Sequence, residues 1–130
     1  MPDQSMPPRV LVVDDGTLIR LYYRETLEAA GFEVAEAING IEALEKILSE
    51  RFDLVIVDIN MPKMDGVSFL RALRGQEGPA GAVPALVISS ESGERDADAA
   101  RAAGANFYLV KPIAAADLAL HVAVLTGVPA

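Results

Sequence analysis

The sequence predicts an α/β protein whose single parallel β-sheet is covered by helices on both faces. Five short strand-like runs are spaced along the 130 residues, and most of them are continuously apolar. Such runs are typical of strands buried on both faces. Helical periodicity separates the runs, and strands that alternate with helices form a parallel sheet through right-handed crossovers. Four of the runs end in charged or hydroxyl side chains, which marks one sheet edge as a candidate site.

The composition favours one compact domain in a reducing compartment. The chain is 52% hydrophobic and 23% charged, and its net charge of −8 disfavours binding to nucleic acid. It has no cysteine, which excludes disulfides and thiolate chemistry. Without a membrane-length apolar run or a signal peptide, we expect a cytoplasmic protein. The predicted organisation is a loose arm at 1–8, one domain at 9–126 and a tail at 127–130, without an output domain unless the chain is a piece of a longer protein.

The first predicted strand, 10–13, is cut off by the adjacent acids Asp14 and Asp15. A helix should follow to about residue 30, with Gly31 as its stop. Leu18 and Leu21 lie off its expected inner face, either as ordinary surface residues or as a partner-docking patch. That inner face is expected to consist of Ile19, Tyr22, Tyr23, Thr26 and Ala30.

The next segments give a strand at 32–37, a turn at 39–40 and a helix to about residue 51. The helix is expected to pack through Ile41, Leu44, Ile47 and Leu48. The central strand, 54–57, ends abruptly in Asp58 and is followed by a turn. A short helix marked by Val67, Leu70 and Leu73 and a loose connection at 75–83 should come next.

The last third of the sequence repeats the pattern of strand-like runs that end in polar side chains. A strand at 85–88 ends in Ser89 and Ser90, and a weakly packing helix is expected at 93–103. A fifth strand at 107–110 ends at Lys111, before a last helix at 115–125. That helix is apolar around nearly its whole circumference, which indicates a partner or a second copy packed on it, or slack packing.

The strand ends should converge on one pocket, because all carboxyl ends of a parallel sheet lie along one edge. Asp14, Asp15, Asp58, Ser89 and Lys111 would then lie together. Close carboxylates repel each other unless a cation lies between them, and Mg²⁺ prefers such oxygen ligands together with a phosphate oxygen. Asp58, alone at its strand end, is the candidate nucleophile for phosphoryl transfer. Taken singly, these features could equally be a turn or helix cap, a loop and a buried salt bridge.

Taken together, the motifs resemble the receiver domain of bacterial two-component response regulators, from about residue 9 to residue 125. They are Val-Val-Asp-Asp, Val-Asp-Ile-Asn-Met-Pro-Lys-Met-Asp-Gly, Val-Ile-Ser-Ser and Gly-Ala-Asn-Phe-Tyr-Leu-Val-Lys-Pro, in the family's order. The resemblance implies a doubly wound, flavodoxin-like sheet of strand order 2-1-3-4-5.

The resemblance also implies roles. Asp58 would accept the phosphoryl group, Asp15 would bind Mg²⁺ directly and Asp14 through water, and the backbone carbonyl of Asn60 would complete the protein ligands. Lys111, joined to the next proline by a cis bond, would bind a phosphoryl oxygen.

Two further residues would form the switch. Ser89 would be the switch hydroxyl, and Tyr108 would be the aromatic that follows it, although a half-exposed strand aromatic is the plain alternative. Asn60 and Glu91 stand where the family tunes the phosphoryl lifetime, as in fast-turnover chemotaxis receivers, whereas Ser90 departs from the usual Ala or Gly.

The function implied is a stand-alone switch. A sensor histidine kinase or phosphotransfer protein would phosphorylate Asp58, with self-catalysed transfer and dephosphorylation, and the signal would leave through the face of the last two helices and the fifth strand. Asn106 stands near the place of an acid in DNA-binding members, and His121 is not expected to be phosphorylated. A Mg²⁺-dependent phosphatase is disfavoured because Asn60 stands where a second acid is needed. A degenerate scaffold is disfavoured by the intact acids and lysine.

Overall fold

The computed structural model describes residues 7–61, 63–90 and 93–127. Strands and helices alternate as the sequence predicts. Their bounds are β1 (Arg9–Val13), α1 (Thr17–Ala29), β2 (Glu33–Ala37), α2 (Gly40–Ser49), β3 (Leu54–Val57), α3 (Gly66–Arg74), the 3₁₀ helix η1 (Gly78–Ala82), β4 (Ala85–Ser89), α4 (Glu94–Ala103), β5 (Phe107–Val110) and α5 (Ala115–Thr126).

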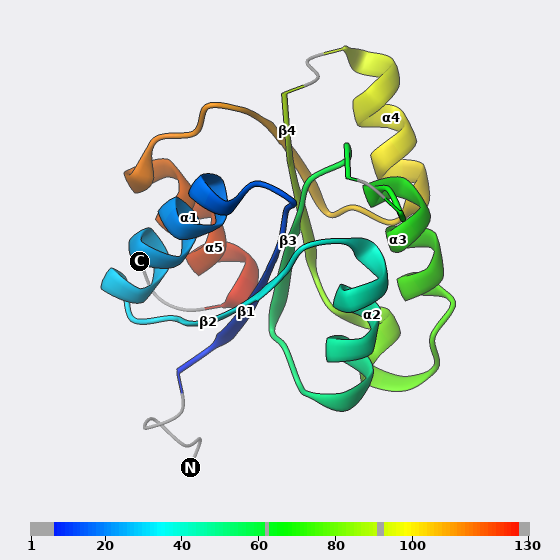
Figure 1. The fold of residues 1–130 in the computed structure, drawn as a ribbon, viewed down its shortest axis with the longest axis horizontal. Coiled ribbons are helices and arrows are strands. Elements are labelled where there is room, and N and C mark those ends of the chain that lie inside the picture. Colours follow the sequence, from blue (N-terminus) through cyan, green and yellow to red (C-terminus); the bar gives the residue numbers. More distant parts are fainter. Residues whose placement is uncertain (1–6, 62, 91–92, 128–130) are drawn as a thin grey trace.

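The strands form one parallel sheet in the order β2-β1-β3-β4-β5, which confirms the doubly wound, flavodoxin-like topology. Helices α1 and α5 cover one face, and α2, α3 and α4 cover the other (Figure 1). Every residue of β3 and β4 is buried, as expected for strands with helices on both sides. No helix in the described part of the chain has the length and apolar character to cross a bilayer.

The buried face of α1 differs from the prediction. Tyr23 and Leu27 are its fully buried side chains, whereas Tyr22 is 37% exposed and Ala30 is also exposed. Tyr22 is instead held at the surface, where its hydroxyl donates to the carbonyl oxygen of Ile113 at 2.8 Å. Leu18 and Leu21 do point away from the core, at 81% and 46% exposed.

Helix α2 corrects the prediction in a similar way. Its buried residues are Gly40, Ala43 and Ile47, and the predicted inner residues Ile41 and Leu48 are 46% and 58% exposed. The reason is close approach, because a Cβ on Gly40 would lie 2.9 Å from a Met64 side-chain atom and 3.0 Å from Phe69. The helix therefore packs closely through Gly40 and Ala43, beside the predicted inner residue Ile47.

The predicted turn at 39–40 is the start of α2. Asn39 is its N-cap, and the Asn39 side chain accepts a hydrogen bond from the backbone N–H of Glu42 at 2.8 Å. The connection at 75–83 is also more ordered than predicted. It contains η1, and the side chain of Arg74 donates to the carbonyl oxygens of Gly81 and Val83.

The last elements match their predicted character. The buried side chains of α4 are Ala100 and Ala103, so this helix packs through small groups. Helix α5 buries Leu118, Val122 and Ala123. Apolar side chains remain at the surface of β5 and α5, with exposed fractions of 45% for Phe107, 42% for Val110, 49% for Leu120 and 66% for Val124.

Candidate functional site

The predicted acids meet at the carboxyl edge of β1 and β3. Val13 pairs with Val57, so the residues that follow each strand lie side by side. The register continues one step further, since the backbone N–H of Asp58 donates to the carbonyl oxygen of Val13 at 3.0 Å. The N–H of Asp14 likewise donates to the carbonyl oxygen of Ala37 at 3.1 Å. Main-chain pairing therefore fixes both acids.

Three carboxylates form a compact cluster. One oxygen from each of Asp14, Asp15 and Asp58 lies within 4.8 Å of the others. Asp14 and Asp58 are buried at 3% and 7% exposed, and Asp15 is exposed to solvent. A hard divalent cation such as Mg²⁺ takes carboxylate oxygens and retains several waters, so two buried acids and one at the solvent boundary fit it.

Lys111, which follows β5, places a positively charged side chain beside these carboxylates. Its Nζ lies 3.0 Å from Asp14 Oδ2 and 3.7 Å from Asp58 Oδ2, across 97 positions of sequence for the first pair. The backbone N–H of Lys111 donates to the carbonyl oxygen of Ser89 at 2.7 Å, which ties the ends of β4 and β5 together. The bond from Lys111 to Pro112 is cis, as the resemblance implies.

Asp58 lies in an environment that opposes its charge. Burial raises the pKa of its carboxyl, and nearby Asp14 raises that pKa further, while Lys111 lowers it. The backbone N–H of Asn60 also favours the carboxylate through a long contact of 3.4 Å to Asp58 Oδ1. The net shift is upward. Asp58 is therefore a carboxylate that gains from any further positive charge brought beside it.

Two groups that hold Asp14 were not identified from the sequence. The backbone N–H of Gly16 donates to Asp14 Oδ1 at 2.9 Å, and Arg20 Nη1 donates to the Asp14 carbonyl oxygen at 2.8 Å. Arg20 also pairs with Glu36 at 2.8 Å and is only 12% exposed. Residue spacing carries no signal for this contact, because it depends on how α1 crosses the strand ends.

Gly66 is a third residue whose importance the sequence did not reveal. The sequence predicts only a turn after Asp58, but a Cβ at residue 66 would lie 2.5 Å from the Asp58 carbonyl oxygen and 2.8 Å from Ile59 Cα. The N–H of Gly66 also donates to the carbonyl oxygen of Ile59 at 2.8 Å. The glycine lets the start of α3 pack directly against the backbone of Asp58.

The structure also places the residues predicted to switch the domain or tune its lifetime. Ser89 is fully buried at the end of β4, and Tyr108 is half-buried and packed against the core under α2, α3 and α4. Asn60 and Ser90 are exposed at the same edge. Glu91 lies outside the described residues.

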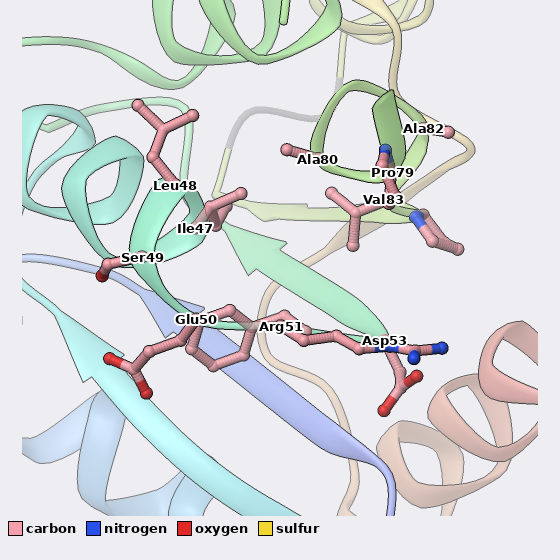
Figure 2. A pocket seen from close by; sticks show the side chains of 12 residues that line it. Ile47, Leu48, Ser49, Glu50, Arg51, Asp53, Pro79, Ala80, Ala82 and Val83 are labelled. Atoms are coloured by element: carbon pink, nitrogen blue, oxygen red, sulfur yellow. The ribbon is translucent and has the colours of Figure 1, made fainter. Parts of the chain in front are cut away.

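A separate hollow lies at the opposite, amino-terminal edge of the sheet (Figure 2). Side chains from the end of α2, such as Leu48, face Pro79 and Ala80 of η1 across it, and Arg51 and Phe52 also line it. It contains none of the three clustered acids and no part of Lys111. The predicted site residues therefore lie outside this hollow.

An acid cluster with a lysine at the carboxyl edge of a 2-1-3-4-5 sheet defines the class of receiver-type α/β domains. Comparison with protein families agrees. The family model for the response regulator receiver domain matches residues 10–123. The chain belongs to this family.

The individual matches include curated relatives and solved structures. The transcriptional regulatory protein PrrA of Mycobacterium tuberculosis is 44% identical over 118 residues, which cover 91% of this chain and 49% of PrrA. The chain thus spans about half the length of the curated relatives it matches. Among solved structures, the chemotaxis protein CheY4 of Vibrio cholerae superposes with a TM-score of 0.86 at 36% identity, covering 92% of this chain and 99% of CheY4. A putative response regulator from Chloroflexus aurantiacus gives a TM-score of 0.87 at 30% identity, covering 94% of this chain and 99% of that one.

Proposed function

We propose that this chain is a Mg²⁺-dependent phosphoryl acceptor of two-component signal transduction, with Asp58 as the phosphorylated residue. The observation that supports this most directly is the buried Asp58 carboxylate, which has Lys111 Nζ 3.7 Å away and two further acids within 4.8 Å. The proposed donor is a sensor histidine kinase or a histidine phosphotransfer protein. The proposed location is the cytoplasm.

In the proposed reaction, a carboxylate oxygen of Asp58 attacks the phosphorus of a phosphohistidine. The new O–P bond forms as the P–N bond breaks, and the electron pair of that bond returns to the donor's imidazole. Lys111 neutralises charge on one phosphoryl oxygen, and the Ser89 hydroxyl donates to another. Asp14, Asp15, Asp58 and the backbone carbonyl of Asn60 would hold a Mg²⁺ ion, which would supply positive charge to the reaction when bound.

The same residues account for self-catalysed dephosphorylation. Water attacks the phosphorus of the acyl phosphate, and the Asp58 carboxylate leaves. The exposed side chains of Asn60 and Ser90 lie at the sheet edge from which that water must come, so they are the described residues best placed to set the lifetime. The chain is in this sense a switch with its own chemistry.

Phosphorylation replaces the single negative charge of the Asp58 carboxylate by a phosphoryl group that carries nearly two, in a pocket that already opposes the charge of Asp58. Lys111 and Ser89 are drawn to the phosphoryl group, and Ser89 is buried at the end of β4, directly before the segment that leads to α4. Tyr108 is half-buried on the adjacent strand and would follow the movement. The result is a population shift of the face made by α4, β5 and α5.

Two apolar surfaces are proposed for partners. Leu18 and Leu21 lie on α1 close to the acid cluster and are 81% and 46% exposed, which suits docking of the phosphoryl donor. The exposed side chains of Phe107, Leu120 and Val124 suit a downstream protein or a second copy of the chain.

The proposal is tested by incubating the protein with Mg²⁺ and acetyl phosphate and following its intact mass. We expect a gain of one phosphoryl group that is lost in Asp58→Asn and with a chelator. Asp98→Asn is the matched control, because Asp98 is a surface acid whose side chain is 77% exposed. No gain in the wild-type protein, or an equal gain in Asp58→Asn, would contradict the assignment. Turnover of a generic phosphomonoester would point to a phosphatase instead.

A further inference from the structure

Helix α4 is attached to the domain very unevenly. From Glu94 to Ala99 no side chain is buried, and the N-cap Gly93 has no capping side-chain hydrogen bond. The two buried side chains, Ala100 and Ala103, both lie in its C-terminal half. The N-terminal half is therefore held mainly by the helix itself.

The C-terminal end is fixed by one side chain from α3. Arg74 Nε and Nη2 donate to the carbonyl oxygen of Gly104, the C-cap of α4, at 3.0 and 2.7 Å. The same guanidinium donates from Nη1 to the carbonyl oxygens of Gly81 and Val83 at 3.1 and 2.6 Å, and from Nη2 to Asn106 Oδ1 at 3.1 Å. We call these five residues the Arg74 cluster.

The Arg74 cluster joins four segments of the fold. Asn106 Oδ1 also accepts from the backbone N–H of Ala85 at 2.9 Å, and the Asn106 N–H donates back to the Ala85 carbonyl oxygen at 2.9 Å. The guanidinium thus ties the end of α3 to the η1 connection and to the junction of α4 with β5, and Asn106 links these segments to the start of β4.

The local backbone is shaped around this contact. Gly104 has φ of +116°, and a Cβ there would lie 2.5 Å from Arg74 Cγ, so only glycine leaves room for the arginine stem. All acceptors of Arg74 among the described residues are uncharged oxygens, and one of them lies at a helix C-terminus, where the helix dipole favours a cation.

The opposite end of α4 begins near the candidate site. Only residues 90–93 separate Ser89, at the carboxyl end of β4, from Glu94 at the first turn of the helix. A displacement of Ser89 therefore reaches the weakly packed end of α4 first, while the Arg74 cluster holds the other end.

We infer that Arg74 is a positioning residue that fixes the C-terminal end of α4, so that the helix responds to the site by tilting about this end. The fixed end is a property of the unmodified protein. The tilting rests on the proposed function, because it needs the phosphoryl group as its trigger.

Backbone amide hydrogen exchange of the full chain tests the fixed end first. In Arg74→Met, the amides of residues 104–106 should exchange at least about tenfold faster than in the wild type, while core amides of β1 stay unchanged. Arg71→Met is the matched control, because Arg71 is an exposed arginine one turn earlier on α3. Equal protection of 104–106 in both variants would overturn the inference, and a uniform loss of protection that includes β1 would reduce Arg74 to a general structural role.

The second comparison adds Mg²⁺ and acetyl phosphate, with intact mass recorded on the same samples. In the wild type, exchange should change at residues 97–99 and stay within about twofold at 104–106, whereas in Arg74→Met it should change at both. Equal changes at both ends of the wild-type helix would refute the tilting. If no phosphoryl group is gained, the proposed function and the tilting fail together, and the fixed end is still judged by the unmodified samples.

Arg74→Lys provides a variant that keeps the charge. Its single ammonium can reach fewer of the carbonyl oxygens than the planar guanidinium, so residues 104–106 should exchange at rates between those of wild type and Arg74→Met. If Arg74→Met does not fold, this variant decides the question, and wild-type rates in Arg74→Lys would then overturn the inference.

Discussion

Replacing Gly66 by alanine tests whether the start of α3 positions the Asp58 carboxylate. The added Cβ would lie 2.5 Å from the Asp58 carbonyl oxygen, where an ordinary contact begins at 3.4 Å, and 2.8 Å from Ile59 Cα. Both atoms belong to the backbone, so no side-chain rotation relieves the clash. Either α3 or the segment at residues 58–59 must shift by about 0.9 Å, the difference between 3.4 and 2.5 Å.

The expected loss of stability follows from two opposing effects. Forcing a methyl group into a filled space costs about 1–3 kcal/mol, whereas replacing glycine by alanine gains about 0.4–1 kcal/mol by restricting the unfolded chain. We therefore expect Gly66→Ala to lower the free energy of unfolding by about 1–2 kcal/mol. Because the shift reaches the backbone of Asp58, Mg²⁺ affinity and phosphoryl uptake should fall as well.

Gly75→Ala is the matched control. Gly75 ends the same helix with an ordinary φ of −78°, and a Cβ there would contact its nearest atoms at 3.5 and 3.6 Å. It should be neutral or slightly stabilising. Urea denaturation measures both variants, and calorimetric titration measures their Mg²⁺ affinity. The reasoning is refuted if Gly66→Ala matches Gly75→Ala in both measurements.

Three further predictions concern charge and hydroxyl groups. Lys111→Met leaves the buried carboxyls of Asp14 and Asp58 without the ammonium group that pairs with them. The free energy of unfolding, measured by urea denaturation, should fall by about 2 kcal/mol, and this loss should shrink when Mg²⁺ is added. An unchanged urea midpoint would contradict this prediction. Burial raises the pKa of Asp58 in the folded state above its ordinary value of 3.8, so the folded state binds more protons than the unfolded state and loses stability as the pH rises above about 4. Asp58→Asn removes this loss, so its stability relative to wild type should increase as the pH rises from about 4, and a pH-independent difference in urea denaturation would count against the reasoning. The Tyr23 hydroxyl is buried with no partner among the described residues, so Tyr23→Phe should stabilise the fold by about 1 kcal/mol. Tyr22→Phe removes a 2.8 Å hydrogen bond and should destabilise the fold by a similar amount. Thermal unfolding that shifted the stability of both variants in the same direction would refute this pair of predictions.

The strands and the site could be predicted from the sequence because both depend on simple geometry. A continuous apolar run such as 54–57 has only one stable place in an α/β fold, buried between two helical layers. Parallel pairing then brings the ends of the runs to one edge whatever their distance in sequence, which is why Asp14 and Lys111 could be placed together.

The helix faces could not be predicted in the same way. Helix α2 has more large apolar residues than its buried face holds, and periodicity alone selected Ile41 and Leu48. The actual face is chosen by how closely the helix approaches Met64 and Phe69, and that distance is set by the absence of a side chain at Gly40. The same limit hid Arg20 and Arg74, whose acceptors are backbone carbonyls that only the assembled fold brings together.

The contacts of Lys111 also explain how one pocket can serve both states of the proposed switch. In the structure, its ammonium lies nearer Asp14, at 3.0 Å, than Asp58, at 3.7 Å, so the unmodified carboxylate of Asp58 is the less compensated of the two. A phosphoryl group on Asp58 would bring new negative charge toward the same ammonium, and a cation held by the acids would release Lys111 from Asp14 to meet it. On the proposed function, metal binding and phosphorylation would therefore be coupled through Asp14 and Lys111, and each would favour the other.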